Sequence, residues 1–281
     1  MIQLKNNDLE INVKKAGAEL TSIKYKDYEY LWQADSKFWG RHAPVLFPIV
    51  GKLKNNECTI KGEIYSMSQH GFARDMDFEV FAQTENSITF ILTNNEETMK
   101  KYPYEFELYI KYEIVDNKVL VKYTVVNAGN DNMFFSIGAH PAFNIEGEFN
   151  DCAIEFDKNE TQNKIFVENG LIKFTDEIRL DNTNTLKLNN NSFAEDAIIF
   201  KDLESSTVTL SSKGDRKVKM NIAGFPYLGI WSKENAPFIC IEPWFGIADT
   251  EEHDGTFRKK KGIIELDIGE EFEAGYSIEV C

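Results

Sequence analysis

The sequence predicts an all-β fold, a large antiparallel β-sandwich, and two observations support this. Apolar residues recur at every second position along much of the 281-residue chain, as in a half-buried strand, whereas a helical period is nearly absent. Phe and Tyr, which favour strands, number 21 and 11, and an apolar content of 42% indicates a packed chain. Because neither a linker nor a sequence repeat interrupts the pattern, we expect one domain over residues 1–281.

The clearest predicted element is a long antiparallel hairpin. Its alternation of side chains runs over residues 104–114, is broken by the turn residues 116–118, and resumes over 119–125. Shorter strands are predicted at 9–13, 20–25, 78–81, 87–92, 153–156, 197–200, 207–211, 218–222 and 263–268.

Two segments depart from the strand pattern. Residues 96–101, which precede Pro103, predict a helix of one or two turns. The interval 157–191 is polar and irregular and contains the runs DNTNT and NNN. We expect it to be a solvated excursion from the sheet, which in a β-sandwich could also carry a binding loop.

The charge and the cysteines restrict the function classes. A net charge of −15 disfavours binding to nucleic acid or an anionic membrane, although a local basic pocket could still hold a small anionic substrate. No stretch approaches the roughly 20 apolar residues that span a bilayer, and the first residues lack a signal-peptide core. The four cysteines are far apart, without CxxC or metal-ligand spacing. We therefore expect a cytoplasmic protein with free thiols, a monomer or homodimer.

The most informative stretch is CIEPWFG at residues 240–246, where Glu242 stands among apolar and aromatic residues. Burial of a lone carboxylate is costly, and an apolar pocket raises its pKa toward the range of a general base. The alternative is a structural Glu paired with a buried Arg or Lys. If residues 238–242 form a strand, Phe238, Cys240 and Glu242 lie on one face of it, and Pro243 is expected to end it.

A second candidate is His140, at the end of the segment 134–140. As a strand, this segment places His140 on one face with Ser136 and Gly138, whose small side chains leave room for a ligand. Pro141 is expected to end the ladder there. Glu242 and His140 would then both lie at strand ends before a proline, as a possible pair of carboxylate base and imidazole acid.

The segment 68–75 collects further polar groups beside a glycine. His70, Gln69 and Arg74 lie within six residues, which suits a loop that hydrogen-bonds hydroxyl groups or an anion. The alternative is a surface turn with an ion pair between Arg74 and Asp75. Arg41 is a further cation that could face a ligand.

Other chemistries are poorly supported by the sequence. It contains no GxSxG elbow, no P-loop, no GxGxxG, and no HExxH or other His/Cys cluster for a catalytic metal. A glycosidase needs two carboxylates, for which Asp196 and Glu242 could serve, but His140 would then have no role.

Taken together, the motifs resemble the aldose 1-epimerase (galactose mutarotase-like) superfamily, most closely its LacX-like branch. Each string is weak alone, but the ordered set spans nearly the whole chain. The matching strings are AGAEL at 16–20, WGR at 39–41, APVLFPIVG at 43–51, QHGFAR at 69–74, GAHPAF at 138–143, DA at 196–197 and IEPW at 241–244.

The resemblance implies a supersandwich with a sugar cleft on one sheet and an isomerase that interconverts the α and β anomers of a free hexose. It implies Glu242 as base and His140 as acid, with no metal or organic cofactor. It implies substrate-binding roles for these residues: His70, Arg74, Gln69, Arg41 and Asp196. Because HGFAR also resembles the hexose-6-phosphate mutarotase branch, a sugar phosphate held by Arg41, Lys52 and Arg74 is an alternative. A non-catalytic carbohydrate-binding protein on the same fold is another.

Overall fold

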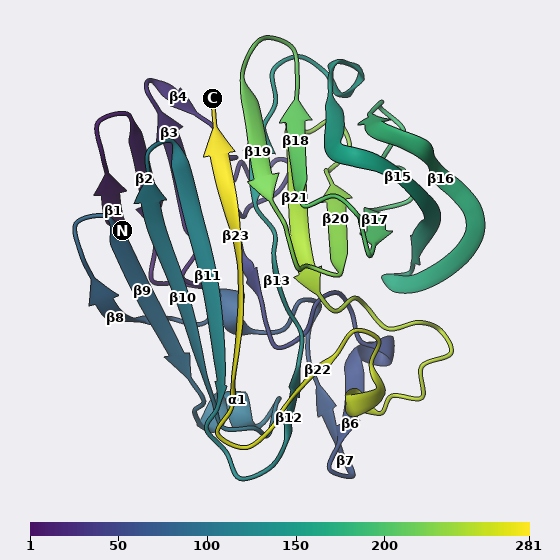
Figure 1. The fold of residues 1–281 in the computed structure, drawn as a ribbon. Helices are drawn as coiled ribbons and strands as arrows, with labels where there is room; N and C mark the ends of the chain where they lie inside the picture. The colour runs from purple at the N-terminus through teal and green to yellow at the C-terminus, as the bar shows by residue number, and fades with distance from the viewer.

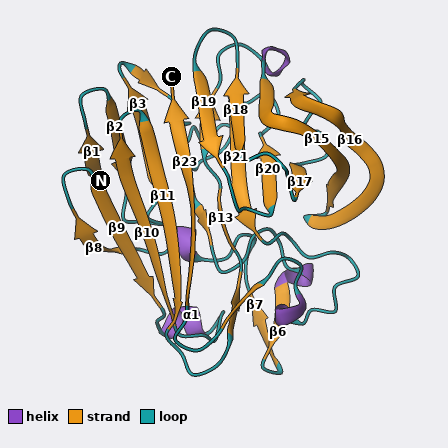
Figure 2. Ribbon diagram, viewed as in Figure 1, coloured by secondary structure: helices purple, strands orange, loops and turns teal.

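The computed structural model describes residues 1–281, and strands dominate it (Figures 1 and 2). Strands account for 53% of the residues and helices for 6%, which confirms the all-β prediction. The α-helix α1 (Glu96–Met99) confirms the predicted short helix, and no helix is long and apolar enough to cross a membrane. The four single turns of 3-10 helix are η1 (Lys54–Asn56), η2 (Ala73–Asp75), η3 (Phe149–Asp151) and η4 (Phe257–Lys259).

A 15-stranded antiparallel sheet forms the body of the molecule. Its spatial order is β5 (Val45–Leu46), β13 (Ile137–Ala139), β21 (Phe238–Phe245), β20 (Tyr227–Trp231), β17 (Ile198–Lys201), β15 (Ala153–Glu168), β18 (Thr207–Ser211), β19 (Lys217–Asn221), β23 (Glu271–Val280), β11 (Lys118–Asn127), β10 (Phe106–Val115), β9 (Ser87–Thr93) and β8 (Glu79–Gln83). In addition, β14 (Ala142–Asn144) pairs with β21, and β16 (Leu171–Lys187) pairs with β15.

Smaller sheets complete the fold. A four-stranded sheet contains β1 (Ile2–Lys5), β2 (Leu9–Val13), β3 (Leu20–Tyr25) and β4 (Tyr28–Glu29), and two-stranded ribbons join β12 (Met133–Phe135) to β22 (Ile264–Leu266) and β6 (Glu57–Ile60) to β7 (Glu63–Ser66). Buried side chains from the four-stranded sheet and from β9, β10 and β11 belong to one core cluster of 64 residues. This shared core holds the sheets face to face because the apolar side of each would otherwise face water.

The predicted long hairpin is confirmed by β10 and β11. The two strands pair from Phe106 opposite Asn127 to Val115 opposite Lys118, and the turn places Asp116 at a φ of 54°. Alternate residues of β10 are buried, as the period-two pattern requires. The nine shorter predicted strands also lie in strands of the structure, although several end at different residues.

The strand β23 was not among the predicted strands, although it joins the two parts of the large sheet. It pairs with β11 on one side and with β19 on the other (Figure 1). Its centre carries Ala274 and Gly275 in place of large apolar residues, which weakens the pattern. A Cβ at Gly275 would lie 2.9 Å from the carbonyl oxygen of Val121, so the two backbones approach closely there.

The prediction of an irregular excursion over 157–191 was wrong. This interval is mostly the long bent hairpin of β15 and β16, which pair from Ala153 opposite Lys187 to Glu168 opposite Leu171 (Figure 1). Four register shifts interrupt the ladder, and few side chains of either strand are buried. Backbone pairing therefore holds this hairpin with little apolar burial, so the alternation that marks a strand in the sequence is missing.

The prediction that Pro243 ends its strand was also wrong, because β21 continues through it to Phe245. On one edge β21 pairs with β14 up to Cys240 and with β13 from Trp244, so neither strand pairs with Pro243 there. The N–H of Ile241 donates to Pro141 on this edge, and alternation along the strand directs the backbone nitrogen of Pro243 to the same side. A proline is tolerated because its missing N–H falls where the ladder is broken.

The indole of Trp244 lies across glycines on both neighbouring strands. A Cβ built at Gly138 on β13 would lie 2.5 Å from the Trp244 ring, and one at Gly229 on β20 would also lie 2.5 Å from it. The two glycines therefore give the ring the space in which it lies flat on the sheet.

We predict that Gly229→Ala lowers the free energy of unfolding by about 1–3 kcal/mol, because the added methyl group displaces the Trp244 ring. Urea denaturation followed by tryptophan fluorescence measures this. Gly129→Ala is the matched control, because its Cβ would make only contacts of 3.5 Å or longer. Equal unfolding midpoints for the two variants would contradict the prediction.

Candidate active site

A cavity of about 420 Å³ opens beside β21, and most of the predicted site residues line it. Six of the seven candidates contribute to its wall: Glu242, His140, His70, Gln69, Arg74 and Asp196. These residues come from four separate regions of the sequence, so only the fold brings them together. Arg41 is not part of the wall.

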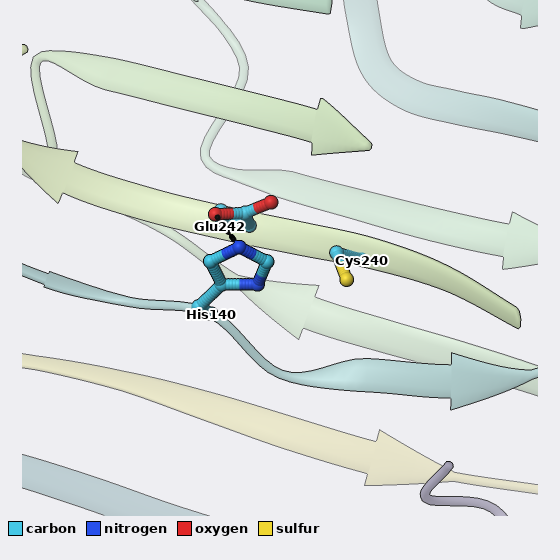
Figure 3. Close-up of side chains that lie close together, drawn as sticks. All are labelled: His140, Cys240 and Glu242. Carbon is cyan, nitrogen blue, oxygen red and sulfur yellow. Dashed lines mark ion pairs between the residues drawn. The ribbon is translucent and has the colours of Figure 1, made fainter. Parts of the chain in front are cut away.

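Glu242 and His140 meet at the base of this cavity. Oε2 of Glu242 lies 3.3 Å from Nε2 of His140, and the side chains are 1% and 10% exposed. Figure 3 shows the imidazole edge directed at the carboxylate, with Cys240 on the same face of β21. Neither Glu242 Oε2 nor His140 Nδ1 has a hydrogen-bond partner. The prediction that these residues are close in space is therefore consistent with the geometry, and their roles stay predictions.

The break between β13 and β14 explains why the two residues meet. Gly138 of β13 lies opposite Trp244, and Ala142 of β14 lies opposite Cys240. The residues between these pairs, including His140, therefore pass opposite Glu242. Because no residue of β13 or β14 pairs with this stretch of β21, the His140 backbone can turn its side chain into the cavity.

Aromatic side chains that the sequence reasoning did not assign to the site enclose the histidine. The ring of Trp39 stacks on His140 with centroids 4.8 Å apart, and Trp231 meets it edge to face at 5.7 Å. Trp39 and Trp231 both line the cavity, as does Trp244. The WGR and IEPW strings contained Trp39 and Trp244, but nothing in the sequence showed that the ring of Trp39 would cover the imidazole.

His70 is held in a single tautomer by a backbone contact. The N–H of Gly51 donates to Nδ1 of His70 at 3.1 Å, and the N–H of His70 donates to the Gly51 carbonyl at 2.8 Å. With Nδ1 as acceptor, the neutral ring carries its proton on Nε2. Burial, and then the nearby charges of His140 and Arg74, hold the pKa of His70 well below its usual value, so this neutral form is favoured.

The pKa values of the central pair shift toward the uncharged forms. Burial, reinforced by the charge of Asp196, raises the pKa of Glu242 well above its usual value. Burial, followed by the charge of Arg74, lowers the pKa of His140 to about 3. Both shifts follow from the same cause, since a buried site penalises either charge.

Glu19, another buried carboxylate, shows what Glu242 lacks. Burial acts to raise its pKa too, but hydrogen bonds from His42 and Lys14 outweigh burial and lower the pKa of Glu19 to about 2. Backbone N–H groups of His42 and Ala43 also donate to it, at 2.8 and 3.1 Å. Glu242 has no lysine or arginine partner, so the structure excludes the alternative of a buried Arg or Lys pair.

Arg74, in the cavity wall, and Arg41, outside it, lie on either side of one carboxylate. Nη2 of Arg74 donates to the Gln69 carbonyl at 2.7 Å, while its Nε is buried without a partner. Nη2 of Arg41 donates to Asp75 at 2.7 Å, and Asp75 also lies 3.8 Å from Nε of Arg74. One carboxylate thus neutralises part of the charge of two guanidinium groups.

Another part of the cavity wall comes from the β15–β16 hairpin and the segment before β17. Val167, Gly170 and Ile172 from the hairpin tip line the cavity, so the polar interval does contribute to the candidate site. Asp196 has a φ of 75°, and its Oδ1 accepts a hydrogen bond from the N–H of Ala197. Lys233 also lines this side, although the sequence reasoning did not predict it.

A buried ion pair connects two of the segments that form the cavity wall. Lys260 is fully buried, and its Nζ lies 2.9 Å from Oδ1 of Asp249. The backbone of Asp249 donates to the Lys52 carbonyl at 2.9 Å and accepts from the N–H of Ile172 at 2.8 Å, while its Oδ2 accepts from the N–H of Lys54. Asp249 therefore connects the segment around Gly51 and Lys52 to the β15–β16 hairpin. Because Gly51 is bonded to His70, this connection also helps to position His70.

Comparisons with known proteins agree with this architecture. The sequence profile of the aldose 1-epimerase family matches residues 1–265. The chain belongs to the aldose 1-epimerase family. Protein LacX of Lactococcus lactis subsp. lactis is 37% identical over 281 residues, covering 94% of each protein, so this family member resembles LacX.

Solved structures extend the similarity to three dimensions. A galactose mutarotase related enzyme from Lactobacillus acidophilus is 37% identical with a TM-score of 0.95, covering 100% of this chain and 97% of that one. A galactose mutarotase-like protein from Lactobacillus casei is 34% identical with a TM-score of 0.93, and both chains are covered completely. The family member therefore has the galactose mutarotase-like fold that its motifs predict.

We predict that Lys260→Met destabilises this family member by about 3–5 kcal/mol, because it leaves the buried Asp249 carboxylate unpaired. The matched control is Lys259→Met, which removes an exposed ion pair with Asp254 and should cost no more than about 1 kcal/mol. Urea denaturation of both variants measures the difference. Similar losses at the two neighbouring lysines would show that the buried pair has no special role.

Proposed function

We propose that this protein is an aldose 1-epimerase that interconverts the α and β anomers of a free hexose by acid–base ring opening. The observation that carries the proposal is the 3.3 Å approach of Glu242 to His140 in a cavity lined by polar and aromatic side chains. Membership of the aldose 1-epimerase family supports it. Ring opening requires one proton to be removed and one to be delivered, which such a pair supplies.

In the proposed mechanism the C1 hydroxyl faces Glu242 and the ring oxygen faces His140. The carboxylate takes the hydroxyl proton, C1 forms a carbonyl, the bond from C1 to the ring oxygen breaks, and the ring oxygen takes a proton from the imidazolium. Rotation about the C1–C2 bond and the reverse steps give the other anomer. Total charge is conserved in each step, and the enzyme returns to its starting protonation state.

The burial of the pair supports this order of events. Ring opening converts an imidazolium and a carboxylate into a neutral imidazole and a carboxylic acid, the forms that the raised pKa of Glu242 and the lowered pKa of His140 favour. A site that penalises buried charge therefore raises the energy of the reactive imidazolium–carboxylate pair relative to the open-chain intermediate.

We assign substrate binding to the polar groups around the pair. His70 offers its Nε2–H as a donor, since Nδ1 is occupied by Gly51, and this Nε2 lies 3.3 Å from the side-chain amide of Gln69. Gln69, Arg74 and Asp196 line the same cavity and offer donors and acceptors for sugar hydroxyls. Arg41 lies outside the cavity wall and is bound to Asp75, so its charge would affect the electrostatic potential near Arg74 without contact with the sugar.

A second candidate is a mutarotase for a hexose 6-phosphate. The observation that favours it is the buried Nε of Arg74, which has no partner and could donate to a phosphate oxygen. Arg41 would add charge beside it if the phosphate replaced part of the contact with Asp75. Lys52 lies outside the cavity wall, and its Nζ donates to the Asn169 carbonyl.

We also propose that residues 1–281 fold as one unit in the cytoplasm. The C-terminal strand β23 pairs between β11 and β19, so neither part of the large sheet is complete without the other. The four cysteines form no disulfide, and three of them are buried, which fits a reducing compartment.

We predict that Glu242→Gln and His140→Asn each lower kcat/KM for anomer exchange by about 10²–10⁴-fold, the usual contribution of a positioned acid or base. Saturation-transfer NMR on glucose and galactose measures the exchange, and ligand-observed NMR measures binding. Glu113→Gln, at a partly exposed residue of β10, is the control. Binding without any acceleration by the wild-type protein would instead favour a non-catalytic carbohydrate-binding protein.

We predict that Arg74→Gln separates the two candidate substrates. If the substrate is a 6-phosphate, the variant should lose roughly 10–100-fold in kcat/KM for glucose 6-phosphate or galactose 6-phosphate, with a much smaller loss for the neutral sugar, because a charged hydrogen bond is removed. Equal losses for both sugars identify the neutral hexose as substrate. Lys52→Gln is the matched cation control outside the cavity wall.

A further inference from the structure

The proposed catalytic pair has a third potential ligand beside it. Sγ of Cys240, a nitrogen of His140 and a carboxylate oxygen of Glu242 all lie within 4.8 Å of one another, and all three residues are buried. We propose that these three side chains bind a thiophilic divalent cation, Zn²⁺ above all, and that the bound ion inhibits the enzyme. The inhibition rests on the proposed function, whereas the binding does not.

The backbone fixes two of the three ligands relative to each other. Cys240 and Glu242 are two residues apart on β21, so their side chains leave the same face of the strand (Figure 3). His140 faces them from the break between β13 and β14. A site on rigid strands requires little ordering when the ion binds, which favours affinity.

The distances suit a small tetrahedral ion. Zn²⁺ bonds of about 2.0–2.3 Å to nitrogen, oxygen and sulfur place neighbouring ligand atoms roughly 3.5 Å apart. The Glu242 Oε2 to His140 Nε2 distance is already 3.3 Å. The sulfur, within 4.8 Å of a ring nitrogen of His140 and of a carboxylate oxygen of Glu242, needs to approach by only about 1 Å.

The charges of the site also suit a divalent cation. Glu242 is buried with Oε2 unpartnered, and no lysine or arginine contacts it. When the ion binds, the Cys240 thiol and the Glu242 carboxylic acid release their protons to solvent and bond to the metal as thiolate and carboxylate. One thiolate, one carboxylate and a neutral imidazole then balance the two positive charges, so the buried complex is neutral overall.

The ligand set determines which metals are expected. Sulfur and imidazole ligands favour Zn²⁺ and neighbouring transition metals over Mg²⁺ and Ca²⁺, which prefer oxygen. Three protein ligands leave a fourth position of the tetrahedron open for water. The bound ion would be coordinated by the Glu242 oxygen and the His140 nitrogen that the proposed proton transfers require. The pair could then no longer open the sugar ring.

The binding test uses Co²⁺ in place of Zn²⁺, because a cobalt–thiolate bond gives a near-ultraviolet charge-transfer band. The parent is the full chain with Cys281→Ser, which removes the one exposed cysteine. Titration should produce the band, excess Zn²⁺ should remove it, and Cys240→Ser should abolish it. Cys152→Ser, at a buried thiol outside the cluster, is the matched control and should keep the band.

The activity test compares each protein with itself, with and without Zn²⁺. We expect Zn²⁺ to slow anomer exchange in the parent and in Cys152→Ser, and Cys240→Ser to need at least about 10-fold more Zn²⁺ for the same inhibition. Glu242→Gln, whose fold can be checked by circular dichroism, should also weaken the Co²⁺ band, so the test does not depend on Cys240→Ser folding.

The outcomes separate the two proposals. A parent without a Co²⁺ band, or a band that persists in Cys240→Ser, overturns the metal site whatever the enzyme does. A band that depends on Cys240 and Glu242 in a protein that accelerates no anomer exchange supports the site and overturns the proposed function. Zn²⁺ inhibition of equal strength in the parent and in Cys240→Ser overturns the inhibitory role assigned to this cluster.

Discussion

The burial of Glu242 without a cationic partner is the constraint on which the rest of the candidate site depends. An uncompensated buried carboxylate costs several kcal/mol in its charged form, so the protein holds it with a raised pKa. Glu19 in the same molecule shows the common structural solution, a lysine and backbone donors that keep the carboxylate charged. Glu242 has an imidazole and aromatic walls instead, an arrangement suited to moving a proton rather than to stabilising a fold.

This environment exists because one ladder of the large sheet is interrupted. The edge of β21 changes partner from β14 to β13, and the residues between these strands carry His140 past Glu242. Both prolines that follow the central residues fall in the interrupted region, where missing N–H groups break no ladder bond. Small residues at Gly138 and Gly229 then let Trp244 cover the sheet as part of the cavity wall. The candidate site therefore depends on the interrupted ladder, since a continuous ladder would leave no space for the imidazole beside Glu242.

The surrounding walls are held by hydrogen bonds between segments that are distant in the sequence. Asp249 joins the segment around Gly51 and Lys52 to the β15–β16 hairpin and is neutralised by the buried Lys260. Gly51 in turn fixes the tautomer of His70. The net charge of −15 therefore says little about the cavity, where Arg74 and Lys233 line the wall and oppose the acidic surface.

The sequence by itself determined the fold class and many of the strands, and it singled out the two central residues of the candidate site. Period-two alternation reports one-sided burial directly, so β10 and β11 could be predicted, and an isolated carboxylate among aromatic residues marked Glu242. The β15–β16 hairpin beyond residue 156 could not be predicted, because backbone pairing with few buried side chains leaves no pattern of apolar residues. Tertiary structure alone decided that β21 passes through Pro243, that Trp39 stacks on His140, and that Cys240 lies beside the pair. These features depend on which strands become neighbours, and a local pattern in one segment contains no information about the side chains that another segment will place against it.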